Sequence, residues 1–334
     1  MPVAITEGGV GLIGDKIYVV EGWRPDNAWV TADDILEYDP VMDSWKIMIS
    51  GPVATGSFAS CLLDGKMYIL GGMEGISSME DANKMWTYDP LREEWDITSL
   101  PDMIYPHLMH GTAEVINGKI YVIGGVGLPP EFNIAQSEVF DGEKWEPIAE
   151  MPVPVTMHSS IVHNQKILVF GGDSAWTMRK GYSTNFIQEY DPVPDTWRLL
   201  DPMPFQRSGM ACEKLGNFVY LIGGATDDRD GSTYVSEMWR YELESLVDPG
   251  VGISNSRADQ FSVFPNPVLD LLNVQTGLSA DHVIEIISLN GQVVYSMTMD
   301  QSVYQIELSS FQKGVYLITI RSKEFVTTKK IIKL

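Results

Sequence analysis

Short apolar segments that end in glycine recur along the first three quarters of the chain. Five of them are recognisable: KIYVVEG ending at Gly22, KMYILGG at Gly72, KIYVIGG at Gly125, KILVFGG at Gly172 and FVYLIGG at Gly224. The glycines are separated by steps of 50, 53, 47 and 52 residues. A nearly constant period of this size is typical of an array of structural repeats.

Each of the first four repeats continues with an aromatic residue before an aspartate and then a tryptophan. The aromatic–Asp pairs are Tyr38-Asp39, Tyr88-Asp89, Phe140-Asp141 and Tyr190-Asp191, and the tryptophans are Trp45, Trp95, Trp145 and Trp197. Three of the aspartates precede proline, and an Asp carboxylate caps nearby amides while proline fixes φ, so we expect a turn here. The repeated tryptophans are expected to pack the repeats together.

Each unit therefore predicts four short strands: a small apolar strand, the strand before the glycines, a strand ending at the aromatic–Asp turn, and a strand holding the tryptophan. A four-stranded sheet cannot bury both faces alone, so such units pack side by side around an axis. The expected fold class is all-β, with a β-propeller of one blade per repeat.

The glycine pair, the later aromatic residue and the tryptophan beyond it resemble the kelch repeat, and the resemblance covers about residues 1–247. Two units depart from the pattern. The first has Glu21-Gly22 in place of the glycine pair, and the fifth contains Trp239 and Tyr241 but no fourth-strand tryptophan.

The start of the chain is in register with the ends of fourth strands elsewhere. Met1-Pro2 stands where later repeats have Met151-Pro152 and Met203-Pro204. We therefore expect Met1 to be internal to a longer native chain whose upstream part holds at least a closing fourth strand. Five repeats are visible, which leaves five or six blades natively.

A different pattern begins after the last repeat. Residues 248–260 read as a linker rich in Gly, Ser, Asn and Asp, and residues 261–334 alternate β-rich runs with turn signals. Asn290-Gly291 between two such runs is a strong hairpin signal. Six or seven short strands in this length predict a small Ig-like β-sandwich.

This tail resembles the type A C-terminal sorting domain of the type IX secretion system of Gram-negative bacteria. The residues that carry the resemblance are Pro265, Asn266, Pro267, Asn290, Gly291, Gly314, Tyr316, Lys329, Lys330 and Lys333. The resemblance implies that the type IX machinery is a partner and that the protein is secreted or placed on the outer-membrane surface. Cargo of this system also needs an N-terminal export signal, which we expect upstream of Met1.

The charge distribution separates the two parts of the chain. The formal net charge is −22, whereas the seven acidic and seven basic residues of the segment 250–334 cancel. The propeller therefore carries the whole excess of acid, which argues against nucleic acid or an anionic membrane surface as a partner. No apolar run is long enough to predict a membrane span. Cys61 and Cys212 fall in different repeats and are expected to be small core residues.

Loops that follow the glycine pairs hold aromatic residues that suit a sugar ring or a protein surface. These candidate ligand-binding residues are Trp23, Trp29, Trp176, Tyr182 and Tyr234, with Phe132 in the same class of loop. The alternative is that they pack between neighbouring loops.

Charged residues precede several first strands, which should line the central channel. His110, His158 and Arg207 stand at equivalent positions, and Glu7 is nearby in the first repeat. Their convergence at the channel mouth predicts a ligand pocket. Structural capping of the channel is the alternative, and a metal held by the two histidines would lack obvious further ligands.

One acidic loop matches the spacing of a calcium-binding loop. Asp228, Asp230 and Glu237 fall at positions 3, 5 and 12, with Gly231 at position 6, but Thr226 replaces the first aspartate. A solvated acidic loop is the alternative, and no other cofactor is expected.

Two functions of different class remain open. The first is a secreted or cell-surface protein whose propeller face binds a glycan or a protein, and it is favoured because no nucleophile motif, phosphate loop or metal signature is present. The alternative is a carbohydrate-active enzyme like the kelch-type oxidases or sialic-acid epimerases. An epimerase would need a base and an anion clamp, for which Glu7 or Glu114 with Arg207 are nominal candidates.

Overall fold

The computed structural model describes residues 1–24, 30–51, 54–73, 82–128, 132–174, 182–228, 231–243, 261–264, 268–276, 282–288, 292–299, 303–321 and 326–333. Its named elements are all strands, which confirms the expected all-β class. Within those residues no helix has the length and apolar character needed to cross a bilayer.

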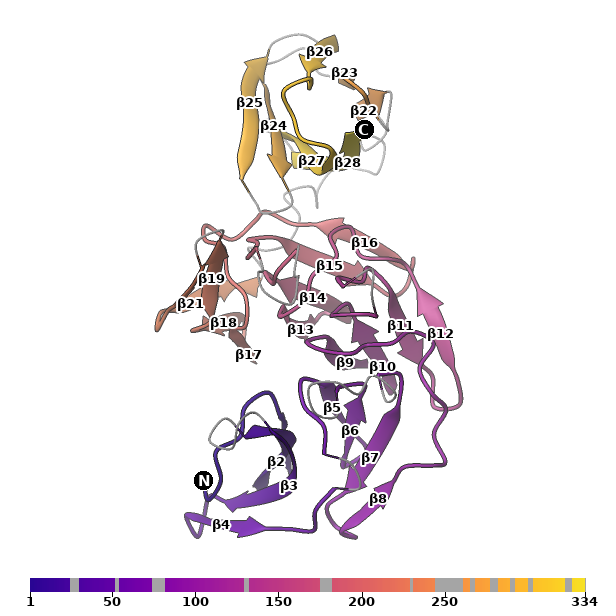
Figure 1. The fold of residues 1–334 in the computed structure, drawn as a ribbon, viewed down its shortest axis with the longest axis vertical. Helices are drawn as coiled ribbons and strands as arrows, with labels where there is room; N and C mark the ends of the chain where they lie inside the picture. The colour runs from indigo at the N-terminus through magenta and orange to yellow at the C-terminus, as the bar shows by residue number, and fades with distance from the viewer. Residues whose placement is uncertain are drawn as a thin grey trace.

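Five antiparallel sheets follow one another around an arc and form the blades of a propeller (Figure 1). The first four blades each have four strands, in the order in which they occur along the chain. Their bounds are β1 Gly9–Ile13, β2 Lys16–Arg24, β3 Val30–Asp39 and β4 Ser44–Ile47; β5 Ala59–Leu63, β6 Lys66–Leu70, β7 Met85–Asp89 and β8 Glu94–Asp96; β9 Thr112–Ile116, β10 Lys119–Ile123, β11 Ser137–Phe140 and β12 Trp145–Ile148; β13 Ser159–His163, β14 Lys166–Phe170, β15 Ile187–Asp191 and β16 Thr196–Leu199.

The fifth blade has three strands among the described residues, in the order β17-β18-β21. They are β17 Ala211–Leu215, β18 Phe218–Ile222 and β21 Met238–Glu242, and a separate hairpin of β19 Ala225–Asp228 and β20 Gly231–Tyr234 connects the second to the third. The inner strands β1, β5, β9, β13 and β17 lie next to one another in that order and line the centre of the arc (Figure 1).

The aromatic–Asp turn and the tryptophan form the predicted unit in each of the first four blades. The aromatic residue pairs across strands with the tryptophan, as Tyr190 does with Trp197, and the four ring-centroid distances are 4.9, 5.2, 5.2 and 5.1 Å. The Asp191 carboxylate accepts the Val193 N–H at 3.0 Å, and the other three aspartates each accept two such N–H groups. The turn mechanism predicted from the sequence is confirmed.

The glycine pairs join each blade to the next one. The second glycine donates its N–H to a carbonyl of the following repeat: Gly22 to Thr55 at 2.8 Å, Gly72 to His107 at 3.1 Å, Gly125 to Val155 at 3.0 Å and Gly172 to Arg207 at 2.8 Å. All four have positive φ, which glycine adopts without a steric penalty. Glycine therefore recurs at this position because the backbones of neighbouring blades approach closely there.

The tail forms two facing antiparallel sheets, ordered β22-β23-β26 and β25-β24-β27-β28, which confirms the predicted small sandwich. Its strands are β22 Phe261–Phe264, β23 Leu271–Thr276, β24 His282–Ser288, β25 Val293–Met299, β26 Val303–Glu307, β27 Gly314–Arg321 and β28 Val326–Lys333. Eleven buried residues fill the space between the sheets, among them Leu272, Ile286 and Ile318.

The sorting-motif residues lie on this frame where the structure describes them. Gly314 opens β27, Tyr316 lies on the same strand, and Lys329, Lys330 and Lys333 lie on β28. The strands β24 and β25 pair as the hairpin that was predicted. Pro265, Asn266, Pro267, Asn290 and Gly291 themselves lie outside the described residues.

The tail sandwich contacts the propeller through a second apolar face. Leu317 of β27 is 2% exposed and joins the cluster of blades 3 and 4, and Ile287 packs against the same cluster. The Arg321 guanidinium lies 3.6 Å from the Asp201 carboxylate at the same junction. The sandwich therefore lies against the fourth blade, beside β15 and β16 (Figure 1).

Candidate functional site

A chain of backbone hydrogen bonds runs from the first blade to the fifth along the mouth of the central channel. One residue per blade takes a left-handed conformation just before the inner strand, with φ of 56°, 61°, 57°, 52° and 59° for Glu7, Ser57, His110, Met157 and Gly209. Each N–H from Ser57 onwards donates to the carbonyl of the equivalent residue in the preceding blade, at 3.1, 2.7, 3.2 and 2.7 Å. We call these five residues the mouth ring.

The mouth ring corrects one part of the sequence interpretation. His110 belongs to it, but His158 follows the ring residue Met157, and Arg207 precedes the ring residue Gly209 by two positions. The three are therefore not equivalent. Only the connection before His110 differs in length: 15 residues separate it from Trp95, against 12 between Ser57, Met157 or Gly209 and the tryptophan before each.

Side chains of the first three ring residues contact one another. The Glu7 carboxylate accepts a hydrogen bond from the Ser57 hydroxyl and lies 3.8 Å from Nδ1 of His110. The Trp23 indole N–H donates to Ser57 Oγ at 2.9 Å. Burial lowers the pKa of His110, although the Glu7 charge acts in the opposite direction. The structure thus brings together Glu7 and His110, as predicted, with Trp23 as their buried support.

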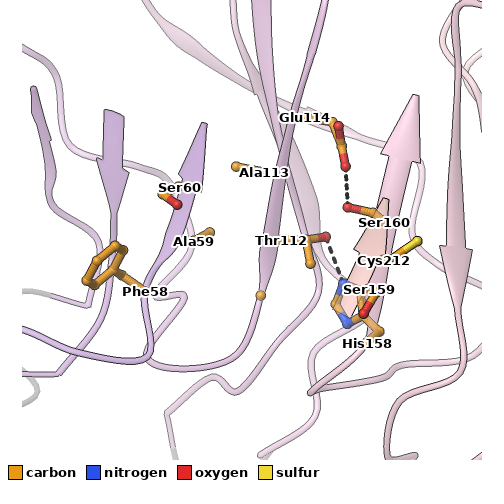
Figure 2. A pocket seen from close by; sticks show the side chains of 11 residues that line it. Phe58, Ala59, Ser60, Thr112, Ala113, Glu114, His158, Ser159, Ser160 and Cys212 are labelled. Atoms are coloured by element: carbon orange, nitrogen blue, oxygen red, sulfur yellow. Dashed lines mark hydrogen bonds between the residues drawn. The ribbon is translucent and has the colours of Figure 1, made fainter. Parts of the chain in front are cut away.

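A pocket of about 280 Å³ lies directly below the ring, between the first residues of the inner strands. Figure 2 shows its lining, which comes from four neighbouring blades. The lining residues are Phe58, Ala59, Ser60, Gly111, Thr112, Ala113, Glu114, His158, Ser159, Ser160 and Cys212.

Glu114 is the acidic residue of this lining. It lies on β9 and accepts a hydrogen bond of 2.6 Å from Ser160 Oγ on β13, so it bridges blades 3 and 4 (Figure 2). Burial raises the pKa of the Glu114 carboxyl to about 7, Glu213 on β17 adds to the rise, and the Ser160 hydrogen bond opposes it. Near neutral pH this group is therefore both a hydrogen-bond donor and an ionisable acceptor.

His158 forms the base of the same pocket wall. Its Nε2 lies 3.0 Å from the Thr112 hydroxyl, which links the residue before β13 to β9 (Figure 2). Burial lowers the pKa of His158 to about 4. The imidazole is thus neutral at physiological pH, and it offers hydrogen bonding without adding a positive charge to the pocket.

The two cysteines, expected to be small core residues, are free thiols in separate blades and pack partly buried against core clusters. Burial raises the pKa of Cys61 and of Cys212. Protonated thiols are poor nucleophiles, so Cys212 contributes a weakly polar wall to the pocket.

Arg207 lies away from the pocket lining. It is 4% exposed, its guanidinium donates to the Gly223 carbonyl at 3.1 Å and to the Glu237 carboxylate at 3.2 Å, and it stacks 5.0 Å from the Phe205 ring centroid. These contacts join the connection before β17 to the fifth blade, while the Arg207 carbonyl accepts the Gly172 N–H of the fourth blade. Its charge is compensated within the fold.

The predicted loop aromatics do not form one surface among the described residues. Trp23 is 5% exposed and packs among Met73, Leu108 and Val126, whereas Tyr234 on the β19–β20 hairpin is 85% exposed. Tyr182 is half-buried, and Phe132 packs on the same cluster as Trp23. Trp29 and Trp176 lie outside the described residues.

The segment with calcium-loop spacing forms the β19–β20 hairpin, in which Asp228 pairs with Gly231. The Glu237 carboxylate is held by Arg207 and by the Trp239 indole, and these hydrogen bonds lower the pKa of Glu237. Asp230 lies outside the described residues. Calcium binding here stays a prediction, to which the hairpin geometry adds no support. In the described ranges no three His, Cys, Asp or Glu side chains gather as a metal site would need.

Sequence reasoning missed two features. The first is the hydroxyl lining of the pocket, because the first strands were interpreted as small and apolar. The signal was present: Ser60, Thr112, Ser159 and Ser160 all fall in the first half of an inner strand. Small side chains are required where inner strands crowd together, and serine and threonine satisfy that requirement while adding hydrogen-bonding groups.

The second is a fully buried pair, His107 and Glu138, with Nε2 and Oε1 3.2 Å apart and exposures of 1% and 0%. Glu138 also accepts the N–H groups of Ile104 and Tyr105, at 2.8 and 3.0 Å. It fastens the connection between blades 2 and 3 and belongs to the frame behind the site. Nothing in its local sequence distinguishes it from an exposed strand glutamate.

Comparisons with known proteins agree with this architecture. The family model described as the KLHDC2/KLHL20/DRC7 Kelch-repeats domain matches residues 4–224. A second, described as a secretion system C-terminal sorting domain, matches residues 262–334.

Individual relatives are similar to parts of the chain. Kelch-like protein 15 of Danio rerio is 30% identical over 67% of this chain and 31% of its own length. Beta-scruin of Limulus polyphemus is 30% identical over 37% of this chain and 14% of its own length. These alignments thus span less than a third of either relative. The solved structure of YjhT superposes with a TM-score of 0.60 at 16% identity, covering 72% of this chain and 82% of that one, which supports the fold alone.

Proposed function

The chain belongs to the kelch-repeat family, and from this premise we propose that it is an exported binding protein whose channel pocket takes part of a glycan or of another protein. Its sorting domain indicates export by type IX secretion to the surface or surroundings of a Gram-negative cell. Kelch domains are protein-interaction modules. The proposal adds the place at which the ligand is bound.

The observation that carries it is the pocket below the mouth ring. Hydroxyls of Ser60, Thr112, Ser159 and Ser160, together with Glu114, surround a concave space that four blades hold in place. Rigid pockets with a few convergent polar groups favour ligand binding, because little ordering cost is incurred when the ligand enters. Hydroxyl groups of a sugar, or a polar protein side chain, match this lining.

A carbohydrate-active enzyme is the second candidate, and one observation favours it. The pKa of Glu114, raised to about 7 chiefly by burial, suits a general acid or base at neutral pH. The anion clamp that an epimerase needs was assigned to Arg207. Since the Arg207 guanidinium is engaged by Gly223 and Glu237, its contacts favour a structural role over that assignment.

Glycan-array and peptide-array binding of the full chain tests the proposal. We expect selective ligands whose binding weakens at least several-fold in Ser160→Val, which removes a pocket hydroxyl, and is unchanged in Ser44→Val, on an outer strand. Arrays without a selective ligand would contradict the proposal. Chemical conversion of a bound sugar, followed by mass spectrometry, would establish the enzymatic alternative instead.

A further inference from the structure

We propose that the channel pocket recognises a positively charged nitrogen, an ammonium or guanidinium group, which pairs with the Glu114 carboxylate. This inference rests on the proposed binding function and names the chemical class of its ligand. An amino sugar and a lysine or arginine side chain share that chemistry. The argument stands on the pocket's charges, its donors and acceptors, and its size.

The lining contains one acidic side chain and no basic one. Its eleven residues include Glu114 but neither lysine nor arginine, and His158 is neutral because burial lowers its pKa to about 4. A part-buried carboxylate without a countercharge is poorly solvated, so its ionised form gains from a ligand of opposite charge. An anionic ligand would be repelled by the Glu114 carboxylate and would find no basic side chain in the lining.

The groups that face Glu114 from neighbouring strands also favour a positively charged ligand. Ser160 on β13 donates its hydroxyl hydrogen, Glu213 on β17 adds negative potential, and Cys61 and Cys212 are protonated thiols whose pKa values are raised by burial. Beyond the pocket, the chain carries a formal charge of −22. Both the local and the overall field therefore attract cations toward the channel.

The remaining polar groups complete a site for an ammonium ion. Such a group carries three hydrogens, for which the Glu114 carboxylate is the charged acceptor; Ser60 and Ser159 also line the pocket, and the Ser159 hydroxyl donates to the Met210 carbonyl. Figure 2 shows Glu114 and Ser160 facing each other, with Thr112 and His158 paired nearby on the same two strands. A volume of about 280 Å³ accommodates one sugar ring or one long side chain rather than an extended polymer.

The pH dependence follows from the carboxyl. In the ligand-free protein the pKa of Glu114 is about 7, so only a minority of molecules are ionised at pH 6 and most at pH 8. The apparent affinity for a cation is reduced by the fraction of the protein that is not ionised. We therefore expect roughly tenfold tighter binding of a lysine side chain, which stays protonated over this range, at pH 8 than at pH 6, with release of a proton from Glu114 on binding at pH 6.

The experiment compares probes that differ only in charge. Isothermal titration of the full chain uses the trimer of glucosamine against the trimer of N-acetylglucosamine, and a lysine-containing tripeptide against its side-chain-acetylated form. The lysine peptides are measured at pH 6 and pH 8 in two buffers of different ionisation enthalpy, and the sugar pair is compared at pH 6, where the glucosamine amines are charged. We expect one charged probe to bind at least tenfold more tightly than its acetylated partner, and the preferred pair identifies the source as sugar or protein.

Variants assign the effect to the pocket. Glu114→Gln, nearly identical in shape, is expected to abolish the preference for the charged probe and its pH dependence. Glu146→Gln makes the same change on the outer strand β12 of the same blade and is expected to change neither. Because the paired probes and the pH series are run on the unmodified protein, the inference is tested even if a variant folds poorly.

Equal binding of charged and acetylated probes, unchanged selectivity in Glu114→Gln, or no binding of any probe would overturn the inference. If neutral or anionic array ligands bind in this pocket, the proposed binding function is supported and the proposal of a cationic ligand is wrong. The two proposals therefore fail on different results.

Discussion

The position of Glu114 lowers the stability of the folded protein and at the same time provides a carboxylate for ligand binding. On a propeller blade, most glutamates point into water; this one lies between β9 and β13, where ionisation is disfavoured by burial. Buried, uncompensated carboxyls are often retained at sites that bind or react, because the cost in stability is recovered when a ligand is bound. The cost itself can be measured without knowing the ligand.

The stability of the protein is predicted to depend on pH through this carboxyl. The pKa of Glu114 rises from 4.5 to about 7 on folding, so the folded state binds more protons between those values and stability falls as pH rises through the window. Glu114→Gln should therefore raise the melting temperature at pH 8 and leave it nearly unchanged at pH 5. Thermal unfolding at both pH values measures this, with Glu146→Gln as the control; an equal shift at both would contradict it.

Substitution of two glycines in blade 2 distinguishes the cost of a left-handed backbone from the cost of a steric clash with the neighbouring chain segment. Gly65 and Gly71 have φ of 74° and 68°, but a Cβ at Gly65 would meet no atom within 4 Å, whereas one at Gly71 would overlap the His107 carbonyl oxygen. Gly65→Ala should cost about 1–2 kcal/mol, the strain of the left-handed conformation alone. Gly71→Ala should cost clearly more, because the backbone oxygen cannot move away, and urea unfolding measures the difference. Equal costs would show that inter-blade contact at the glycine pair is loose.

At the scale of strands and turns, the same place in two blades can be filled by different chemistry. Glu138 on β11 and Gln188 on β15 occupy equivalent positions in their sheets. Gln188 accepts the Val153 N–H and donates to the Val153 carbonyl, both at 3.0 Å. Glu138 instead accepts two N–H groups and contacts His107. Both side chains fasten the incoming connection from the preceding blade.

Removing the buried carboxylate should expose this role. Glu138→Leu leaves two N–H groups and His107 without their acceptor, and we expect a loss of about 3 kcal/mol or more. Glu138→Gln should lose less, since Gln188 shows that an amide can fasten the same connection. Chemical denaturation of the three proteins tests the order; a leucine variant as stable as the wild type would contradict the fastening role.

The elements that could be predicted from sequence are those formed by residues that recur at a fixed spacing and interact with near neighbours in the chain. The aromatic–Asp turn of Tyr190 and Asp191, its partner Trp197 and the glycine pair each act within a few residues or at a fixed step, so the strands and the blade order followed. The register of the mouth ring did not, because its five residues share no side-chain type and its bonds between blades join main-chain atoms. Nor did the pairing of Glu114 with Ser160, since a contact between blades leaves no trace in either strand alone.

At the scale of the whole molecule, the tail sandwich packs against the propeller. Leu317 lies on the face of β27 that does not point into the sandwich core, yet it is buried against the apolar cluster of blades 3 and 4. The Arg321–Asp201 ion pair beside it is well exposed and contributes little. Apolar contact therefore holds the sandwich in place, and its detachment exposes an apolar patch on the fourth blade.

A charge at this junction should release the sandwich without unfolding it. Leu317→Asp is expected to increase the radius of gyration in small-angle X-ray scattering, since an unpaired carboxylate cannot be buried there. Val303→Asp, at a position 54% exposed on the other sheet, is the matched control. Melting curves confirm that both variants fold. An unchanged scattering profile for Leu317→Asp would show that the junction does not depend on this contact.

The mouth ring has a consequence for how such a protein diversifies. Its hydrogen bonds join main-chain atoms only, so glutamate, serine, histidine, methionine and glycine occupy equivalent places in one molecule with the same backbone conformation. The side chains there are consequently released from the task of holding the ring together. Substitutions at Met157 and Gly209 that keep the left-handed backbone leave these main-chain bonds in place, whereas substitutions at Glu7 or Ser57 also remove the side-chain hydrogen bond between them. Related propellers can therefore acquire new specificities at the channel entrance by single substitutions, while the scaffold below is inherited intact.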